Sequence, residues 1–263
     1  EIIGVIKADA YGHGSIMCAK VLRENGVKTF AVATLQEAVT LRKAGTKEDI
    51  IMLGLTPDLY ADVIAEYDIT PVVCDSANAK AISDAAEKMR KTVSGLIAID
   101  TGMGRIGYLA DEIETSIEDI KRIEALSHFK IKGLFSHMST ADAADKTFSH
   151  EQEAKYNAFF QALVKSGINV PVRTLANSAS IMELPSVYFE AVRPGIILYG
   201  CYPSNEVDRN QLSIKPVMSV KANIIHVKNV PENFSVGYGR KYISEKPARI
   251  ATIALGYADG YPR

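Results

Sequence analysis

The chain has 263 residues, of which 47% are hydrophobic and 23% are charged, and its formal net charge is −1. This size and composition allow a large core, in one domain or in one domain and part of another. The near-neutral charge argues against nucleic-acid binding, and no apolar run approaches the roughly 18 residues of a membrane span.

Eight short apolar runs, each able to form a strand, recur between Ile2 and Gly195. Most are continuously apolar, which favours strands that are covered on both faces. In chain order they are IIGVIKA from Ile2, TFAVAT from Thr29, DIIMLG from Asp49, ITPVVCD from Ile69, VSGLIAID from Val93, KIKGLFSHM from Lys130, VRTLAN from Val172 and YFEAVRPG from Tyr188.

Helical patterns separate these runs. Thr34 and Glu37 have the spacing of a capping box, and Gly45 stands where that helix should end. Isoleucines recur at helical spacing over 113–120, and an apolar stripe covers 156–164. Only SASIMELP remains for a short helix between the last two strands.

Strands that alternate with helices in this way predict a (β/α)8 barrel over residues 1–205. A doubly wound open sheet is the structural alternative. Its first turn normally carries the phosphate-binding fingerprint G-x-G-x-x-G, and YGHGS does not match that pattern.

The pattern changes after Gly200. CYPSNEVDRNQ is polar and rich in turn residues, which predicts a linker. Strand-like runs joined by short turns then predict the beginning of a mostly β C-terminal domain over 211–263. Glu1 directly precedes an apolar run and Arg263 follows a turn-like segment, so we expect a piece of a longer protein that lacks both ends. Three cysteines without metal-ligand spacing predict a reduced, cytoplasmic protein without a metal site.

Chemistry-bearing side chains follow several of the predicted strands. In a (β/α)8 barrel, catalytic groups lie at the carboxyl ends of the strands. Each such residue alone has an ordinary structural interpretation, but a lysine, two arginines and a histidine at one end of a barrel favour a catalytic site. The residues at these strand ends are Lys7, Arg105, His137, Asn177, Ser178, Arg193 and Gly195.

These residue types suit a cofactor that carries an aldehyde and a phosphate. The amine of Lys7 can form a Schiff base when its surroundings let it lose its proton. Ser178, Gly195 and Ile196 follow the seventh and eighth strands, where barrels often bind phosphate, and Arg193 could face a ring nitrogen. Pyridoxal phosphate meets all of these demands. A sugar-phosphate aldolase also uses a Schiff-base lysine, but we would expect that lysine deeper in the strand order.

Seven segments of the chain resemble segments of the alanine racemases, which are fold-type III pyridoxal phosphate enzymes. They occur in the family's order and span the whole chain: VIKADAYGHG, DTGMGRIG, FSHMSTAD, ANSAS, VRPGIILYG, VGYGR and IALGYADGYPR. The resemblance implies an isomerase that interconverts L-alanine and D-alanine for peptidoglycan. It also implies a homodimer with composite active sites and no nucleic-acid or membrane partner.

The resemblance implies roles for the matching residues. Lys7 would hold pyridoxal 5′-phosphate covalently and act as one catalytic base, and Tyr257 of the partner subunit would act as the second base. Arg193 would face the pyridine nitrogen, Arg105 would contact the substrate carboxylate, and His137 would link Arg193 to the second base. The remaining cofactor-binding residues would be Tyr11, Asn177, Ser178, Gly195 and Ile196.

One position departs from the family pattern. Many members have a lysine two residues before the aspartate of DTGMGR, and its carbamate positions the arginine. Ala98 stands there in this chain and cannot be carbamylated, so Arg105 must be held in another way. Three alternatives remain open: a serine or alanine racemase of the vancomycin-resistance type, a fold-type III decarboxylase, and a non-catalytic protein that binds pyridoxal phosphate.

Overall fold

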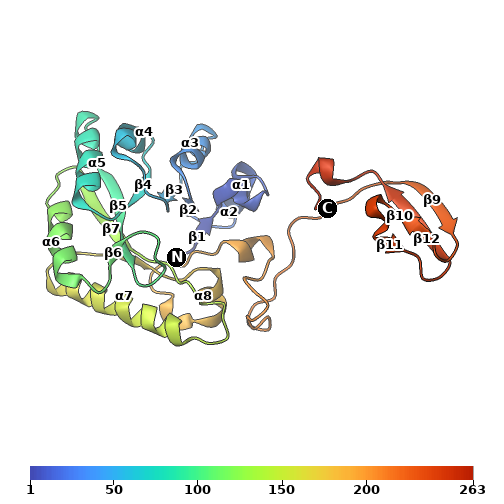
Figure 1. Cartoon of the computed structure of the whole chain (residues 1–263). Coiled ribbons are helices and arrows are strands. Elements are labelled where there is room, and N and C mark those ends of the chain that lie inside the picture. Colours follow the sequence, from blue (N-terminus) through green and yellow to red (C-terminus); the bar gives the residue numbers. More distant parts are fainter. Residues whose placement is uncertain (263) are drawn as a thin grey trace. The chain divides into compact units, whose positions relative to one another are not determined.

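The computed structural model describes residues 1–262, and the chain divides into two compact units between Val217 and Met218 (Figure 1). Arg263, which the sequence indicated as a cut end, lies outside the described residues. No helix within the described part of the chain is long and apolar enough to cross a membrane.

The first unit is built around seven parallel strands in the order β1-β2-β3-β4-β5-β7-β8. A further strand, β6 (Tyr108–Leu109), pairs with the end of β5. The seven strands are β1 (Ile3–Val5), β2 (Thr29–Val32), β3 (Asp49–Met52), β4 (Thr70–Val73), β5 (Val93–Asp100), β7 (Phe129–Phe135) and β8 (Val172–Thr174).

The segment that follows Glu190 closes the ring of strands. Ala191 forms a parallel bridge to β8, and Val192 forms one to Ile2, next to β1. The Ile3 N–H donates to the Val192 carbonyl at 2.9 Å, and the Val5 N–H donates to the Pro194 carbonyl at 3.0 Å. The predicted (β/α)8 barrel is therefore confirmed, with this segment in the eighth position.

The eighth position differs from the regular strand expected over 188–195, because only two isolated bridges form there. Phe189 has a φ of 43°, in the left-handed region, which breaks the extended conformation at the start of the segment. Pro194 has no N–H to donate to a neighbouring strand. Bridges to the neighbouring strands therefore form only at Ala191 and Val192, although the Arg193 N–H and the Pro194 carbonyl still make backbone hydrogen bonds to Ala176 and Val5.

Helices cover the outer side of the strands (Figure 1). They are α2 (Ser15–Glu24), α3 (Leu35–Lys43), α4 (Ala61–Glu66), α5 (Ser76–Lys88), α6 (Ile113–Glu124), α7 (Thr147–Lys165) and α8 (Ser178–Glu183), with short 3-10 turns η1 (Asp58–Tyr60), η2 (Pro185–Val187) and η3 (Ile196–Tyr199). The short element α1 (Lys7–Tyr11) has left-handed backbone angles and lies at the end of β1. The capping box predicted for α3 is present, since Thr34 and Glu37 each accept from the other's backbone N–H. In the α7 stripe, Tyr156, Phe159 and Leu163 are fully buried, whereas Val164 is half-exposed.

The core has two layers, separated by the strands. Large side chains pack between the strands and the helices, with Tyr156, Phe159, Phe30 and Phe129 among them. A smaller cluster contains strand residues only and fills the inside of the barrel. Its members are Ile3, Val5, Ala31, Ile51, Val72, Leu96, Ala98, Phe135 and Ala191.

The second unit is made of antiparallel strands in its described part. β9 (Ile224–Val230) pairs with β12 (Ala248–Ile253), and β10 (Ser235–Val236) pairs with β11 (Tyr242–Ile243). Two short 3-10 turns, η4 (Tyr238–Arg240) and η5 (Tyr257–Asp259), complete it. Its mostly β character agrees with the sequence pattern, although regular pairing begins only at Ile224.

Candidate active site

A cavity of about 230 Å³ lies at the carboxyl ends of the barrel strands. Eight of the ten residues singled out in the sequence line it: Lys7, Tyr11, His137, Asn177, Ser178, Arg193, Gly195 and Ile196. Val5, Leu53, Asp142, Ala179 and Pro203 complete the lining, and the sequence patterns did not single these out. The cavity thus joins residues that follow strands β1, β7 and β8 and the closing segment.

The backbone after Lys7 forms a left-handed turn. Ala8, Asp9, Ala10 and Tyr11 have φ values of 50°, 51°, 55° and 54°. An L-residue in this conformation costs roughly 1–2 kcal/mol, so four in succession need compensating interactions. Hydrogen bonds supply these, including Ala10 N–H to the Ile6 carbonyl at 2.9 Å. The turn lets two side chains four residues apart, Lys7 and Tyr11, face the same cavity.

Glu37 holds this turn from outside it. One oxygen of its carboxylate accepts from the Ala8 N–H at 2.7 Å, and the other accepts from the Ala33 N–H at 2.7 Å. The sequence showed Glu37 only as part of a capping box. The sequence spacing gave no sign of the hydrogen bond to Ala8, because Ala8 follows β1 and Glu37 lies on the helix that follows β2.

Tyr11, Ser178 and Gly195 meet on one wall of the cavity. The Gly195 N–H donates to Ser178 Oγ at 2.8 Å. A Cβ at position 195 would lie 2.8 Å from Tyr11 Oη, so only glycine leaves this space open. Tyr199, a residue that the sequence patterns missed, braces the same wall: its hydroxyl donates to the Val5 carbonyl at 2.9 Å, and its ring packs on that of Tyr11 with 5.1 Å between centroids.

Asn177 has structural contacts in addition to its place in the cavity wall. Its side-chain oxygen accepts from the Ser180 N–H at 3.0 Å and so caps α8. Its side-chain NH₂ donates to the Met138 carbonyl at 3.0 Å. Asn177 therefore ties the end of β8 to the end of β7.

Arg193 is buried, with 3% of its surface exposed. Its guanidinium donates to Thr174 Oγ1 at 2.7 Å and to the Ser136 carbonyl at 2.6 Å, and it stacks over the Phe135 ring at 4.6 Å. Burial lowers its pKa to about 9, so the side chain stays positively charged at neutral pH. The guanidinium is held in one orientation by neutral oxygens.

His137 lies 3.4 Å from Arg193, measured between Nδ1 and Nη2. Burial is the main cause that lowers the pKa of His137 to about 3, and the charges of Arg193, Arg105 and Lys7 lower it further. The imidazole is therefore neutral at physiological pH. Because an arginine can only donate, Nδ1 of His137 is the acceptor, which places its single proton on Nε2.

Lys7 is half-buried, and its pKa is lowered mainly by burial and then by the charges of Arg105 and Arg193. The carboxylate of Glu37 acts in the opposite direction and raises this pKa. The balance makes the amine easier to deprotonate than that of a surface lysine. A free amine is the form that attacks an aldehyde or accepts a proton from carbon.

Arg105 and Tyr257 are the two predicted residues that do not line this cavity. Arg105 is exposed and lines a much smaller neighbouring cavity together with Ser136 and His137. Ala98 is fully buried inside the barrel and makes no polar side-chain contact toward Arg105. Tyr257 begins η5 in the second unit and has 64% of its surface exposed.

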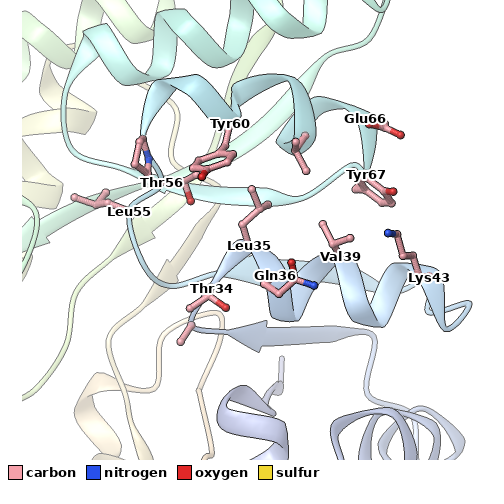
Figure 2. Close-up of a pocket in the computed structure, with 13 residues that line it drawn as sticks. Thr34, Leu35, Gln36, Val39, Lys43, Leu55, Thr56, Tyr60, Glu66 and Tyr67 are labelled. Atoms are coloured by element: carbon pink, nitrogen blue, oxygen red, sulfur yellow. The ribbon is translucent and has the colours of Figure 1, made fainter.

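A larger cavity of about 620 Å³ lies between α3 and α4 (Figure 2). Leu35, Val39 and Tyr67 form much of its wall, and the amine of Lys43 lies 6.0 Å from the centre of the Tyr67 ring. None of the ten predicted site residues lines it. It is a groove between neighbouring barrel helices and does not gather the chemistry found at the strand ends.

Comparison with known proteins places both units in families. The family model described as "Alanine racemase, N-terminal domain" matches residues 1–203, and the model described as "Alanine racemase, C-terminal domain" matches residues 217–263. An alanine racemase of Clostridium kluyveri is 51% identical over 263 residues, which are 100% of this chain and 67% of that protein. One from Clostridium novyi is 49% identical with the same coverage.

Solved structures give the same result. An alanine racemase from Clostridium difficile superposes with a TM-score of 0.90 at 37% identity, covering 100% of this chain and 68% of that one. One from Enterococcus faecalis superposes with a TM-score of 0.85 at 30% identity, covering 98% of this chain and 69% of that one. This chain therefore spans about two thirds of the length of these relatives.

The neutral state of His137 predicts acid sensitivity of the fold. Between its ordinary pKa of 6.5 and its folded value of about 3, the unfolded chain binds a proton that the folded chain does not. Stability therefore rises with pH in this window, and lowering the pH from 6.5 to about 5 should cost about 2 kcal/mol. When urea unfolding is measured at both pH values, the free energy of unfolding of His137→Gln should fall less on acidification than that of the unchanged protein.

His150→Gln serves as the matched control, because His150 is an exposed histidine on α7. Its pH dependence should equal that of the unchanged protein. If acidification lowers the free energy of unfolding equally in His137→Gln and in the unchanged protein, His137 is not held neutral in the folded state.

The contact of Glu37 predicts a charge effect on Lys7. Glu37→Gln removes the negative charge and keeps one accepting oxygen, which can serve either Ala8 or the N–H groups of Ala33 and Thr34, but not both sets. The pKa of Lys7 should therefore fall further, and its amine should react at lower pH. Acetylation of the cofactor-free protein across a pH series, read by mass spectrometry of the Lys7 peptide, measures this shift.

Glu66→Gln, at the exposed end of α4, is the control and should leave the Lys7 profile in place. The acetylation profile of Lys7 against pH could instead move to higher pH in Glu37→Gln or stay in place. Either result would show that the carboxylate charge does not act on this amine.

Proposed function

The chain belongs to the alanine racemase family of isomerases, and on this premise we propose that it interconverts L-alanine and D-alanine with pyridoxal 5′-phosphate. The observation that carries the proposal is the cavity in which the Lys7 amine, with its lowered pKa, lies in one lining with Tyr11, Ser178 and Gly195. The D-alanine would serve peptidoglycan synthesis in the cytoplasm. Residues 1–205 would be the cofactor-binding barrel, and 211–263 would begin a C-terminal β domain.

The cavity residues fit this cofactor. Lys7, Arg105 and Arg193 give this end of the barrel positive charge, which suits an anionic ligand. Tyr11 Oη lies where a Cβ at Gly195 would collide, and Ser178 Oγ accepts from the Gly195 N–H, so both hydroxyls border a polar recess that would suit a phosphate. We propose that these residues hold the phosphate together with Asn177 and the backbone of Ile196.

Pyridoxal phosphate, when bound, draws electrons from the substrate's Cα and so weakens its bond to hydrogen. Racemisation then needs proton removal on one face of Cα and proton delivery on the other. We propose Lys7 Nζ as the group that exchanges the proton on one face. Tyr257 of the partner subunit would exchange it on the other face.

The remaining polar residues would orient the reactants. Arg193 is held by the Ser136 carbonyl and Thr174 and would donate to the ring nitrogen, so that this nitrogen would stay unprotonated beside the guanidinium. Neutral His137 would accept from Arg193 through Nδ1 and donate from Nε2 toward the second base. Arg105 would bind the substrate carboxylate.

The proposed attachment predicts a covalent label on Lys7. Full-length protein treated with pyridoxal phosphate and then borohydride should carry the cofactor on the Lys7 peptide, because this amine is activated by burial and neighbouring cations. The same preparation should racemise L-alanine faster than L-serine, and Lys7→Ala should lose both label and activity. Label on Lys20, which lies on nearby α2, or on no lysine would contradict the assignment. Faster turnover of L-serine would favour a serine racemase.

The two-base proposal predicts complementation between subunits. Lys7→Ala and Tyr257→Ala homodimers should each be inactive in racemisation, with Tyr257→Ala still able to bind the cofactor. In mixed dimers, composite sites would leave one intact site and one doubly damaged site, so partial activity should return on mixing. Activity is measured before and after subunit exchange. A mixture that stays inactive although heterodimers form would place both bases in the same chain.

A further inference from the structure

Gln152 is a fully buried glutamine on α7, with 0% of its surface exposed. Glutamine is seldom fully buried unless its amide is satisfied, and here every hydrogen-bonding position of the amide is used. The oxygen accepts from the Ser139 N–H at 2.9 Å and from Ser139 Oγ at 3.0 Å. The NH₂ donates to Thr101 Oγ1 at 3.1 Å and to the His137 carbonyl at 3.1 Å.

These partners belong to two separate loops of the candidate site. His137 and Ser139 lie just after β7, and Thr101 lies just after β5 in the loop that leads to Arg105. One side chain on a surface helix thus binds the backbone of His137 and the start of the Arg105 loop. The relative position of the two loops depends on this amide.

The Arg105 loop also packs closely on α7 beside Gln152. A Cβ at position 102 would lie 2.7 Å from Phe148 Cζ and 3.5 Å from Gln152 Cγ. Gly102 has a φ of 135°, which an L-residue rarely adopts. A glycine is therefore needed for this approach, and the loop has little room to move closer to the helix.

A second set of contacts extends from the same amide to Arg193. Thr101 Oγ1 lies 3.0 Å from Ser136 Oγ, and both hydroxyls are buried. The Ser136 carbonyl accepts from Arg193 at 2.6 Å. Gln152 therefore contacts the His137 carbonyl directly and is connected to Arg193 through Thr101 and Ser136, while Thr101 begins the loop that leads to Arg105.

We propose that Gln152 is a positioning residue that fixes the loops after β5 and β7, so that Arg105 and His137 face the cofactor cavity in their working orientation. This inference rests on the proposed racemase function. Gln152 does not line the cavity and contacts none of the phosphate-binding residues. Its loss should therefore impair turnover rather than cofactor binding.

Gln152→Met in the full-length protein tests this, because methionine keeps the volume and removes all four hydrogen bonds. We expect kcat for alanine racemisation to fall about 10- to 100-fold, as a displacement of the order of an ångström does in positioned sites. Pyridoxal phosphate affinity, measured by absorbance, should stay close to that of the unchanged protein. A fall in affinity that matches the fall in kcat would overturn the proposal.

Tyr156→Phe is the matched control. Tyr156 is fully buried on the same helix and donates one hydrogen bond to the Leu134 carbonyl, but it contacts neither loop. Its kcat should stay near that of the unchanged protein even where its stability drops. An equal loss of kcat in both variants would show a general effect of disturbing α7.

Amide hydrogen exchange in the cofactor-free protein gives a readout that does not depend on activity. Peptides covering 101–107 and 136–140 should exchange faster in Gln152→Met but not in Tyr156→Phe. Unchanged exchange in these peptides would overturn the positioning role. If the protein without substitutions has no racemase activity, the proposed function is refuted instead. The hydrogen-exchange result would still decide the role of Gln152.

Thr101→Val provides a second variant should Gln152→Met not fold. Valine has nearly the shape of threonine and removes only the hydroxyl that Gln152 and Ser136 contact. Thr101→Val should also lower kcat, and the amides of residues 101–107 should exchange hydrogen faster than in the unchanged protein. Normal kcat and normal exchange in Thr101→Val would contradict the proposed coupling of the two loops.

Discussion

The backbone hydrogen bonds that join β1 to the segment at 192–194 are the constraint on which the candidate site depends. They fix the register of the first strand against the last part of the barrel, at Ile3 to Val192 and Val5 to Pro194. Lys7 therefore leaves β1 beside Arg193 and Gly195, residues from the opposite end of the barrel sequence. In an open sheet the first and last strands would lie at opposite edges, and the amine would be far from the cavity wall formed by Ser178 and Gly195.

Closure also concentrates positive charge, and the chemistry of the site follows from that. Lys7, Arg105 and Arg193 each lower the pKa of His137, and both arginines lower the pKa of Lys7. Burial lowers both pKa values most, and the same cations lower them further, which favours a neutral imidazole and a free amine. Glu37 opposes them at Lys7 while it holds the backbone of Ala8, so one carboxylate influences both the pKa of Lys7 and the conformation of the left-handed turn that follows it.

Sequence patterns predicted the barrel and most of the cavity lining because strand order and strand ends are local features. The apolar run from Val93 and the stripe on α7 appear where they were expected, and Lys7 stands at the end of β1. Contacts between distant segments left no such signal. No sequence pattern singled out Gln152, Glu37 was identified only as part of a capping box, and the left-handed turn occurs in residues other than glycine.

Barrel closure has a consequence for how the polypeptide acquires its structure. The Val5 carbonyl receives its hydrogen bond from Tyr199, so the first strand cannot complete its contacts until nearly the whole barrel sequence has left the ribosome. Contacts of such long sequence separation form slowly, and the unpaired edges of β1 and β8 are open to wrong partners in the meantime. The amine of Lys7 and the wall formed by Ser178 and Gly195 come together only at this last step. A ligand that contacts both Lys7 and this wall can therefore bind only after barrel closure, and a nascent chain that has not reached Tyr199 has no complete cavity.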